Sequence, residues 1–165
     1  MRRTLLLAIV SVGLVGAAPA EGVNLTVVTY DQLGDAVKRH KGKVVLVDFW
    51  FEACLPCKKG FPKVLAMQRK HAERGFVVLT VNVDDPADTP LKESVVAFLG
   101  AQKATCANLQ LDEKTEIWMA KLGVESLPAV FLFDRRGKLL RKWVDDVDYQ
   151  QIDDRVAAEL AAREE

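Results

Sequence analysis

Two cysteines separated by two residues, Cys54 and Cys57, carry the clearest chemistry in the sequence. An apolar run comes before them and a helical pattern follows. Residues three apart on a helix share one face, and disulfide-bonded Cα atoms lie about 5.5 Å apart, so this pair can form a disulfide. The N–H groups and partial positive charge of a helix start favour a thiolate. We therefore expect a redox-active pair, with Cys54 as the exposed attacking thiol and Cys57 as the resolving thiol.

An acidic residue, Asp48, lies inside the apolar run, six residues before Cys54. Burying a carboxyl group is costly unless it has a partner or a task. Burial would raise its pKa and allow it to exchange a proton with Cys57 as the disulfide opens. A structural alternative is that Asp48 only ends a strand ladder or bonds a backbone amide. Both interpretations remain open at this point.

The elements around the cysteines follow a strand–helix–strand pattern. Residues 44–50 are nearly all apolar, as expected for a central strand that is covered on both faces. The helix after Cys54 has Pro56 in its first turn, where the missing N–H costs nothing. An apolar stripe runs along it and it ends near Gly75, before a strand at 76–83. This order favours a parallel crossover between the two strands.

The remaining elements follow from hydrophobic spacing and turn residues. Asp31 is expected to cap a helix that ends near Gly42. Gly137 suits the tight turn of a closing hairpin, whose strands must be antiparallel. The other predicted elements are an edge strand at 24–29, a helix at 91–100, a strand at 105–111, a helix at 117–122, hairpin strands at 129–133 and 138–144, and a last helix at 149–163. The pattern predicts an α/β fold with a mixed sheet.

Length and composition limit the possible functions. The chain has 165 residues, which suits one domain, and its charges balance at zero, so nucleic acid is not an expected partner. The three cysteines suggest one pair and one leftover residue. We expect Cys106 to pack as a small apolar residue, because a second redox role would require it to lie near Cys57.

Nothing in the sequence predicts a metal or another cofactor. A metal site needs about four ligands. Beyond the cysteine pair, the chain offers Cys106, His40 and His71, and we expect both histidines on the surface of helices.

The first twenty residues resemble an export signal. Arg2 and Arg3 precede an apolar run at residues 5–15, and Ala18-Pro19-Ala20 forms a cleavage pattern of small residues. The run is shorter than the roughly 20 residues that span a bilayer. We expect a signal peptide at 1–20 and a mature domain at 21–165 in an extracytoplasmic compartment. The alternative is an uncleaved membrane anchor.

Two segments resemble the thioredoxin superfamily. Residues 47–50 (Val-Asp-Phe-Trp) with 54–57 (Cys-Leu-Pro-Cys) look like its active-site segment, and 126–128 (Ser-Leu-Pro) look like its cis-proline loop. Residues 133–137 resemble its hairpin turn. The resemblance implies that Cys54 attacks a disulfide and that Cys57 releases the mixed disulfide.

The same resemblance implies a substrate-binding surface around the cysteine pair. Pro128 would border the groove, and Leu127 would offer backbone hydrogen bonds to a bound peptide. Trp50, Leu55 and Pro56 complete the expected surface.

An extra helix and strand, roughly residues 91–111, precede the cis-proline loop. With the export signal, this insertion resembles the extracytoplasmic TlpA/ResA type of the thioredoxin fold. Three residues depart from the superfamily pattern. Ala53 replaces a tryptophan beside the first cysteine, Ser126 replaces a frequent glycine, and Asp145 stands where a glycine usually follows the last strand.

The resemblance also implies partners. Strong oxidants of this fold usually carry histidine between the cysteines, whereas this chain has Leu55 and Pro56, so we expect a reductant or a moderate isomerase. Its substrates would be disulfide-containing or thiol client proteins. A membrane thiol-transfer protein of the DsbD/CcdA type would recharge it, and we expect a monomer. The competing hypothesis is a redox-inactive binding module with the same fold.

Overall fold

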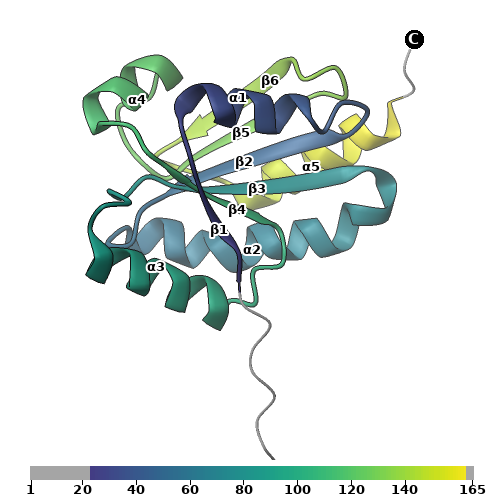
Figure 1. Ribbon diagram of the computed structural model, residues 1–165. Helices are drawn as coiled ribbons and strands as arrows, with labels where there is room; N and C mark the ends of the chain where they lie inside the picture. The colour runs from purple at the N-terminus through teal and green to yellow at the C-terminus, as the bar shows by residue number, and fades with distance from the viewer. Residues whose placement is uncertain (1–22, 163–165) are drawn as a thin grey trace, which may run out of the picture.

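The computed structural model describes residues 23–162, in which strands and helices alternate along most of the chain (Figure 1). The predicted signal peptide, residues 1–20, lies outside the described residues. The elements are β1 (Leu25–Val28), α1 (Tyr30–Lys38), β2 (Val44–Trp50), α2 (Leu55–His71), a 3-10 turn η1 (Ala72–Arg74), β3 (Phe76–Asn82), α3 (Thr89–Ala101), β4 (Ala107–Leu111), α4 (Thr115–Leu122), β5 (Ala129–Phe133), β6 (Leu139–Val144) and α5 (Tyr149–Ala161).

The strands form one mixed sheet in the order β1-β4-β3-β2-β5-β6. β2 pairs in parallel with β3 and antiparallel with β5, so it lies at the centre. β1, β4 and β3 are mutually parallel neighbours, and β6 closes an antiparallel hairpin with β5. The predicted α/β fold with a mixed sheet and an inserted helix–strand element, here α3 and β4, is confirmed.

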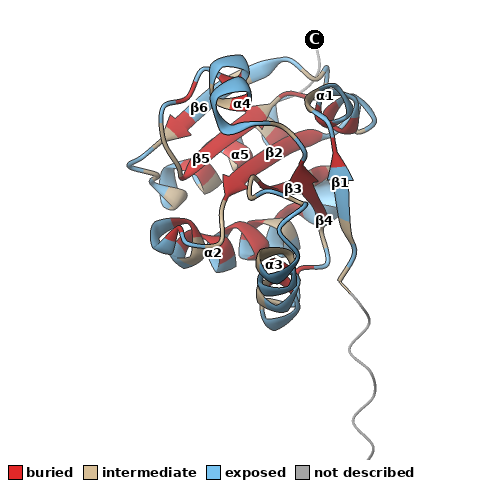
Figure 2. Cartoon of the chain, turned by 60° about the vertical axis from the view of Figure 1, so that its left-hand side comes forward, coloured by how far each residue is buried: buried red, intermediate tan, exposed pale blue. Residues whose placement is uncertain are grey.

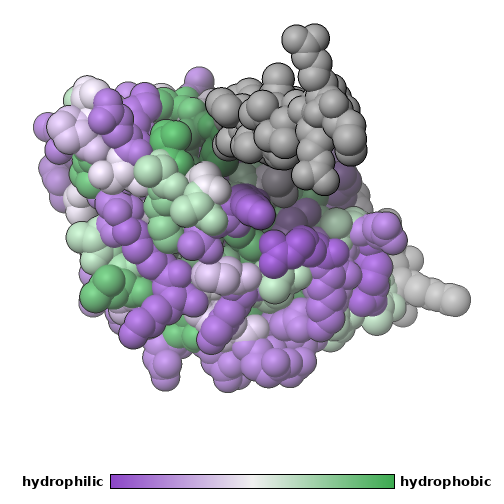
Figure 3. Space-filling view, turned by 90° about the horizontal axis from the view of Figure 1, so that it is seen from below, coloured by the Kyte–Doolittle hydropathy of each residue, from purple (hydrophilic) through white to green (hydrophobic). Residues whose placement is uncertain are grey.

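Helices cover both faces of the sheet. α1 and α4 lie over one face, and α2, α3 and α5 lie over the other (Figure 1). All seven residues of β2 are buried, whereas the helices bury one side only (Figure 2). Seen from the side of α2, α3 and α5, the surface is largely hydrophilic, with hydrophobic residues in small separate patches (Figure 3).

The start of α1 corrects one prediction. Thr29, not Asp31, caps the helix: its hydroxyl accepts from the Gln32 N–H at 3.4 Å, and the Gln32 side chain accepts from the Thr29 N–H at 2.9 Å. This reciprocal capping box satisfies two backbone donors at once. Asp31 lies inside the first turn, where the positive end of the helix favours its negative charge.

The predicted surface position of His71 is also wrong. His71 ends α2 with only 1% of its surface exposed, and its Nε2 lies 2.7 Å from Oδ1 of Asp153 on α5. His40 is half-buried. The partner of His71 is 82 residues away along the chain, so no local pattern could have indicated it.

Candidate active site

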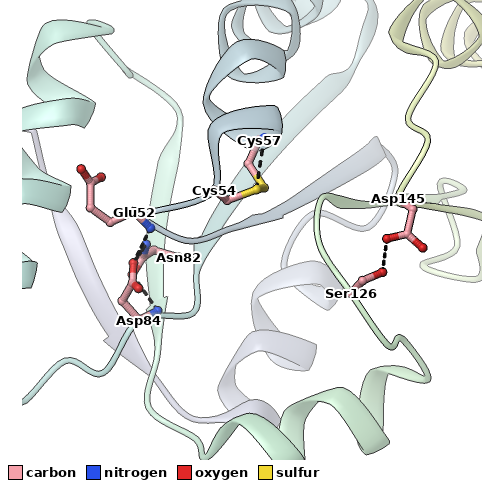
Figure 4. Close-up of a disulfide and its surroundings, with 7 residues drawn as sticks. All are labelled: Glu52, Cys54, Cys57, Asn82, Asp84, Ser126 and Asp145. Atoms are coloured by element: carbon pink, nitrogen blue, oxygen red, sulfur yellow. Dashed lines mark hydrogen bonds between the residues drawn. A yellow bond between two sulfur atoms is a disulfide. The ribbon is translucent and has the colours of Figure 1, made fainter.

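The candidate site lies where three segments meet at one edge of the sheet. The parallel strands β2 and β3 end there, and antiparallel β5 begins there. Cys54 and Cys57 stand at the start of α2, directly after β2 (Figure 4). The cis-proline loop, residues 126–128, leads into β5 at the same edge.

Cys54 and Cys57 form a disulfide with an S–S distance of 2.02 Å and a Cα–Cα distance of 5.3 Å. Cys54 is the N-cap of α2, and its Sγ accepts from the Cys57 N–H at 3.2 Å. Pro56 lies in the first turn as predicted. The helix start thus directs a backbone donor at the sulfur of Cys54, an arrangement that stabilises a thiolate once the disulfide opens.

The predicted exposure of Cys54 is wrong for this oxidised pair. Cys54 is 4% exposed and Cys57 is 1% exposed, whereas Leu55 between them is 69% exposed. Both cysteines pack in one cluster with Phe61 and Leu65. Leu55 and Pro56 therefore form the outer surface of the pair.

The connection between β2 and α2 is held by the carboxylate of Asp84, which follows the end of β3. Asp84 Oδ2 accepts from the backbone N–H of Glu52 and from Nδ2 of Asn82, both at 2.7 Å (Figure 4). The side chain of Glu52 forms an ion pair with Lys58 in the first turn of α2. Sequence reasoning missed Asp84. Its position directly after a strand parallel to β2 was the available signal, because such strands end at the same edge.

Leu127–Pro128 is a cis peptide bond, as the resemblance implied. Two departures from the superfamily pattern contact each other here: Ser126 Oγ donates to the carboxylate of Asp145 (Figure 4). The N–H of Asp145 also donates to the carbonyl of Pro128 at 3.0 Å. Asp145 has φ +65°, the left-handed conformation that favours glycine. An aspartate tolerates it here with two contacts to the loop.

An apolar pocket of about 280 Å³ opens beside the cis-proline loop. Ser126 and Leu127 of the loop line it, together with Phe51, which follows β2. The other lining residues are Val83, Asp84, Thr115, Trp118 and Met119. The pocket is large enough to receive an apolar side chain beside the cis-proline loop.

Trp50 does not form part of this surface. It is 0% exposed, and its ring lies 5.4 Å from that of Phe61 and 5.1 Å from that of Phe98, between centroids. Trp50 therefore supports the start of α2 from beneath. Leu127 is half-buried and Pro128 is buried at the loop.

Asp48 is 1% exposed on the side of β2 that faces α2. Neither carboxyl oxygen has a hydrogen-bond partner among residues 23–162, and the β2 ladder continues past it to Trp50. Asp48 therefore neither bonds a backbone amide nor ends the ladder. Burial raises its pKa to about 8. A carboxyl with such a pKa can take and return a proton near neutral pH.

Cys106 is half-buried just before β4, at the margin of the cluster that contains the disulfide. Its thiol contacts Oδ1 of Asn108 at 3.6 Å. Burial raises the pKa of this thiol to about 11, so it remains protonated at neutral pH. Within residues 23–162, no group of three or more His, Cys, Asp or Glu side chains is arranged to hold a metal ion.

Comparison with known proteins connects this geometry to a family. Residues 42–139 match the family model described as "Thioredoxin-like". The chain is 26% identical over 133 residues to the thiol-disulfide oxidoreductase ResA of Bacillus cereus (strain ZK / E33L), covering 81% of this chain and 73% of that one. It is 35% identical over 104 residues to ResA of Bacillus subtilis (strain 168), covering 61% and 52%.

A solved structure supports the same assignment. A candidate thiol:disulfide interchange protein DsbE from Chlorobium tepidum superposes with a TM-score of 0.63 at 31% identity, over 74% of this chain and 84% of that one. Residues 42–139, matched by the family model, contain the cysteine pair and the cis-proline. The chain belongs to the thioredoxin-like family.

Proposed function

We propose that the protein is an exported thiol-disulfide oxidoreductase that reduces protein disulfides through Cys54 and Cys57. The observation that carries this proposal is the Cys54–Cys57 disulfide at the start of α2, at the sheet edge shared with the cis-proline loop. The names of its relatives, thiol-disulfide oxidoreductases, support the same reaction.

The reaction proceeds in two thiol–disulfide exchange steps. In the reduced protein, the Cys54 thiolate attacks one sulfur of a client disulfide, which releases the other sulfur as a thiol and leaves a mixed disulfide. Cys57 then attacks Cys54, which releases the second client thiol and forms the disulfide seen here. Asp48 takes the proton of Cys57 during this second step, because its raised pKa makes it a base of suitable strength.

The client segment would bind across the edge formed by Leu55, Pro56, Leu127 and Pro128. Leu55 and Pro56 are exposed beside the sulfurs, and the backbone of Leu127 offers hydrogen bonds to an extended chain. The neighbouring apolar pocket would take one side chain of the client. Ala53, exposed and small, leaves room beside this edge where relatives of the fold carry tryptophan.

The cellular setting of the proposal rests on residues 1–20, whose charged start, apolar run and small residues suit an export signal. None of the helices within residues 23–162 is both long and apolar enough to cross a membrane. A monomeric domain of residues 21–165 would work outside the cytoplasm, where a membrane thiol-transfer protein of the DsbD/CcdA type would return it to the reduced form. An uncleaved segment 1–20 would instead anchor the same domain.

Reduction of insulin disulfides tests the reaction. Wild type and Cys106→Ser should reduce insulin at similar rates, because Cys106 has no step in the exchange. Cys54→Ser should lose the activity. A Cys54→Ser protein as active as wild type would contradict the proposal and favour a redox-inactive binding module.

The direction of electron flow is tested by titration with oxidised and reduced glutathione. We expect a potential nearer to thioredoxin, at about −270 mV, than to DsbA, at about −120 mV. The reason is that Leu55 and Pro56, rather than histidine, separate the cysteines. A value near the DsbA end would contradict the reductant assignment but not the exchange chemistry.

A further inference from the structure

Gly60 and Tyr149 contact each other one helical turn from the disulfide. Gly60 is buried and lies three residues after Cys57, so both residues belong to the same face of α2. A Cβ atom at Gly60 would lie 1.9 Å from the hydroxyl oxygen of Tyr149 and 2.1 Å from the ring carbon that carries it. Only glycine leaves this space free. The Tyr149 hydroxyl therefore occupies a notch in α2 at Gly60, one helical turn after Cys57.

The Tyr149 hydroxyl is a buried polar atom without a hydrogen-bond partner among residues 23–162. Tyr149 is the first residue of α5, and the preceding Asp148 caps this helix by accepting from the N–H groups of Gln150 and Gln151. This cap holds the backbone of the first turn of α5, and therefore the position of Tyr149. A buried hydroxyl held in a fitted notch calls for a partner, because an unsatisfied buried donor is unfavourable.

Asp48 is a second unpartnered group on the same side of the sheet. Both of its oxygens are buried without partners, and its side chain faces the layer formed by α2 and α5. Asp48 lies between Leu46 and Trp50 on the face of β2 that α2 covers, and Tyr149 packs against the cluster that contains Leu46 and Val64. Consistent with this placement, burial first and the charge of Asp48 second raise the pKa of Tyr149.

The groups that surround Asp48 come from several elements. Cys57, at the start of α2, packs in the cluster that contains Trp50, the neighbour of Asp48 on the same face of β2, and Cys106 packs against that cluster. The charge of Asp48 contributes to the raised pKa of Cys106 and of Tyr149 on α5. β3 places Thr80 beside it, and Thr80 donates to Asn108 at 2.8 Å. On α2, the ammonium group of Lys63 lies 5.3 Å from the centre of the Tyr149 ring.

We propose that Tyr149 is a positioning residue for Asp48, whose ionised carboxylate receives a hydrogen bond from the Tyr149 hydroxyl through one water molecule. The inference deepens the proposed function and rests on the role given there to Asp48. In the second exchange, Cys57 transfers its proton to Asp48 while its sulfur attacks Cys54. Tyr149 keeps its own proton throughout and changes only how easily Asp48 ionises.

The direction of the change in the pKa of Asp48 depends on whether its ionised or its protonated form accepts the hydrogen bond. A donor that bonds the carboxylate favours the charged form and lowers the pKa of the acid. Tyr149 thus opposes the increase in the pKa of Asp48 that burial causes. Removing the hydroxyl should raise the pKa of Asp48 by about one unit, the size expected for a net hydrogen bond to a charged group.

The test is a pH titration of the oxidised protein with ¹³C-labelled aspartate, in which the Asp48 signal is assigned by its loss in Asp48→Asn. Tyr149→Phe should move the midpoint of Asp48 upward by about one pH unit. Gly60→Ala should move it the same way, because the new methyl group displaces the intact tyrosine. The matched control is Gly34→Ala on α1, where a Cβ meets nothing within 4 Å, and it should leave the midpoint unchanged.

The double variant and an activity assay separate the remaining outcomes. Gly60→Ala combined with Tyr149→Phe should shift the midpoint no further than either change alone, because both act through one hydroxyl. A midpoint that is unchanged or lowered in a folded Tyr149→Phe protein would overturn the inference, even if insulin reduction is normal. If the Asp48 midpoint is raised in Tyr149→Phe but the wild-type protein does not reduce insulin, the result would support the inference and contradict the proposed function.

Discussion

At the residue scale, the buried carboxyl of Asp48 combines a cost in stability with a proposed task in the reaction. Its pKa in the folded protein, about 8, lies well above the usual value near 4. Between these two pH values the unfolded chain releases a proton that the folded protein keeps. Stability should therefore fall as the pH rises from about 4 to about 8 and then level off.

Asp48→Asn should remove this loss. We expect the variant to be more stable than wild type at pH 7, on the order of 4 kcal/mol, and to match it below about pH 4. The same variant should reduce insulin more slowly near neutral pH, because the base for Cys57 is gone. Urea unfolding at several pH values measures the first effect. Equal stabilisation at pH 3 and pH 7 would show that ionisation of Asp48 is not the cause.

The sequence indicated those residues whose signal is local. Cys54, Cys57 and Asp48 were predictable from spacing and from a charge in an apolar strand, and Pro128 from a short motif. The contacts between Ser126 and Asp145 and between Gly60 and Tyr149 were not predictable, because each joins residues that are distant along the chain. The burial of Cys54 depends on packing beneath α2, which spacing does not describe.

At the element scale, α2 must remain fixed because it carries both cysteines. Its far end is tied to α5 by Asp153, whose carboxylate accepts from Lys70 at 2.5 Å and from His71 at 2.7 Å. Burial acts to raise the pKa of Asp153, but these hydrogen bonds outweigh it and leave the pKa below its usual value. The stability from this pair is therefore present above about pH 4 and is lost as the pH falls through the lowered pKa.

Asp153→Asn should lower the free energy of unfolding at pH 7 by about 1–3 kcal/mol, because buried His71 loses a charged partner. The difference from wild type should shrink as the pH falls below about 4. Chemical denaturation across this range provides the measurement. Asp154→Asn is the matched control on the exposed side of α5 and should change little. A pH-independent loss in Asp153→Asn would contradict an ionic tie between α2 and α5.

Most elements could be predicted from periodicity and turn residues, since the strands of the sheet centre are apolar throughout and Gly75, Gly123 and Gly137 mark ends and turns. The helix cap at Thr29 was misassigned by two residues because Asp31 is also a good capping type. The order of strands in the sheet, with β4 inserted between β1 and β3, required the structure.

At the scale of the whole molecule, one edge of a mixed sheet carries the disulfide at a helix start and a cis-proline loop with an apolar pocket beside it. In the disulfide form both cysteines are buried and Leu55 between them is exposed. Under the proposed function, a client would contact Leu55 and the cis-proline loop. This arrangement favours an extended peptide segment as the substrate, held at the edge while sulfur exchange takes place.

The most direct test of the account is to capture the first exchange. Reduced Cys57→Ser protein should react with a peptide disulfide and stop at the mixed disulfide, because the resolving thiol is absent. Mass spectrometry of the digested adduct should place the peptide on Cys54. An adduct on Cys106 instead, or no adduct with a folded Cys57→Ser protein, would contradict the assignment of Cys54 as the attacking thiol.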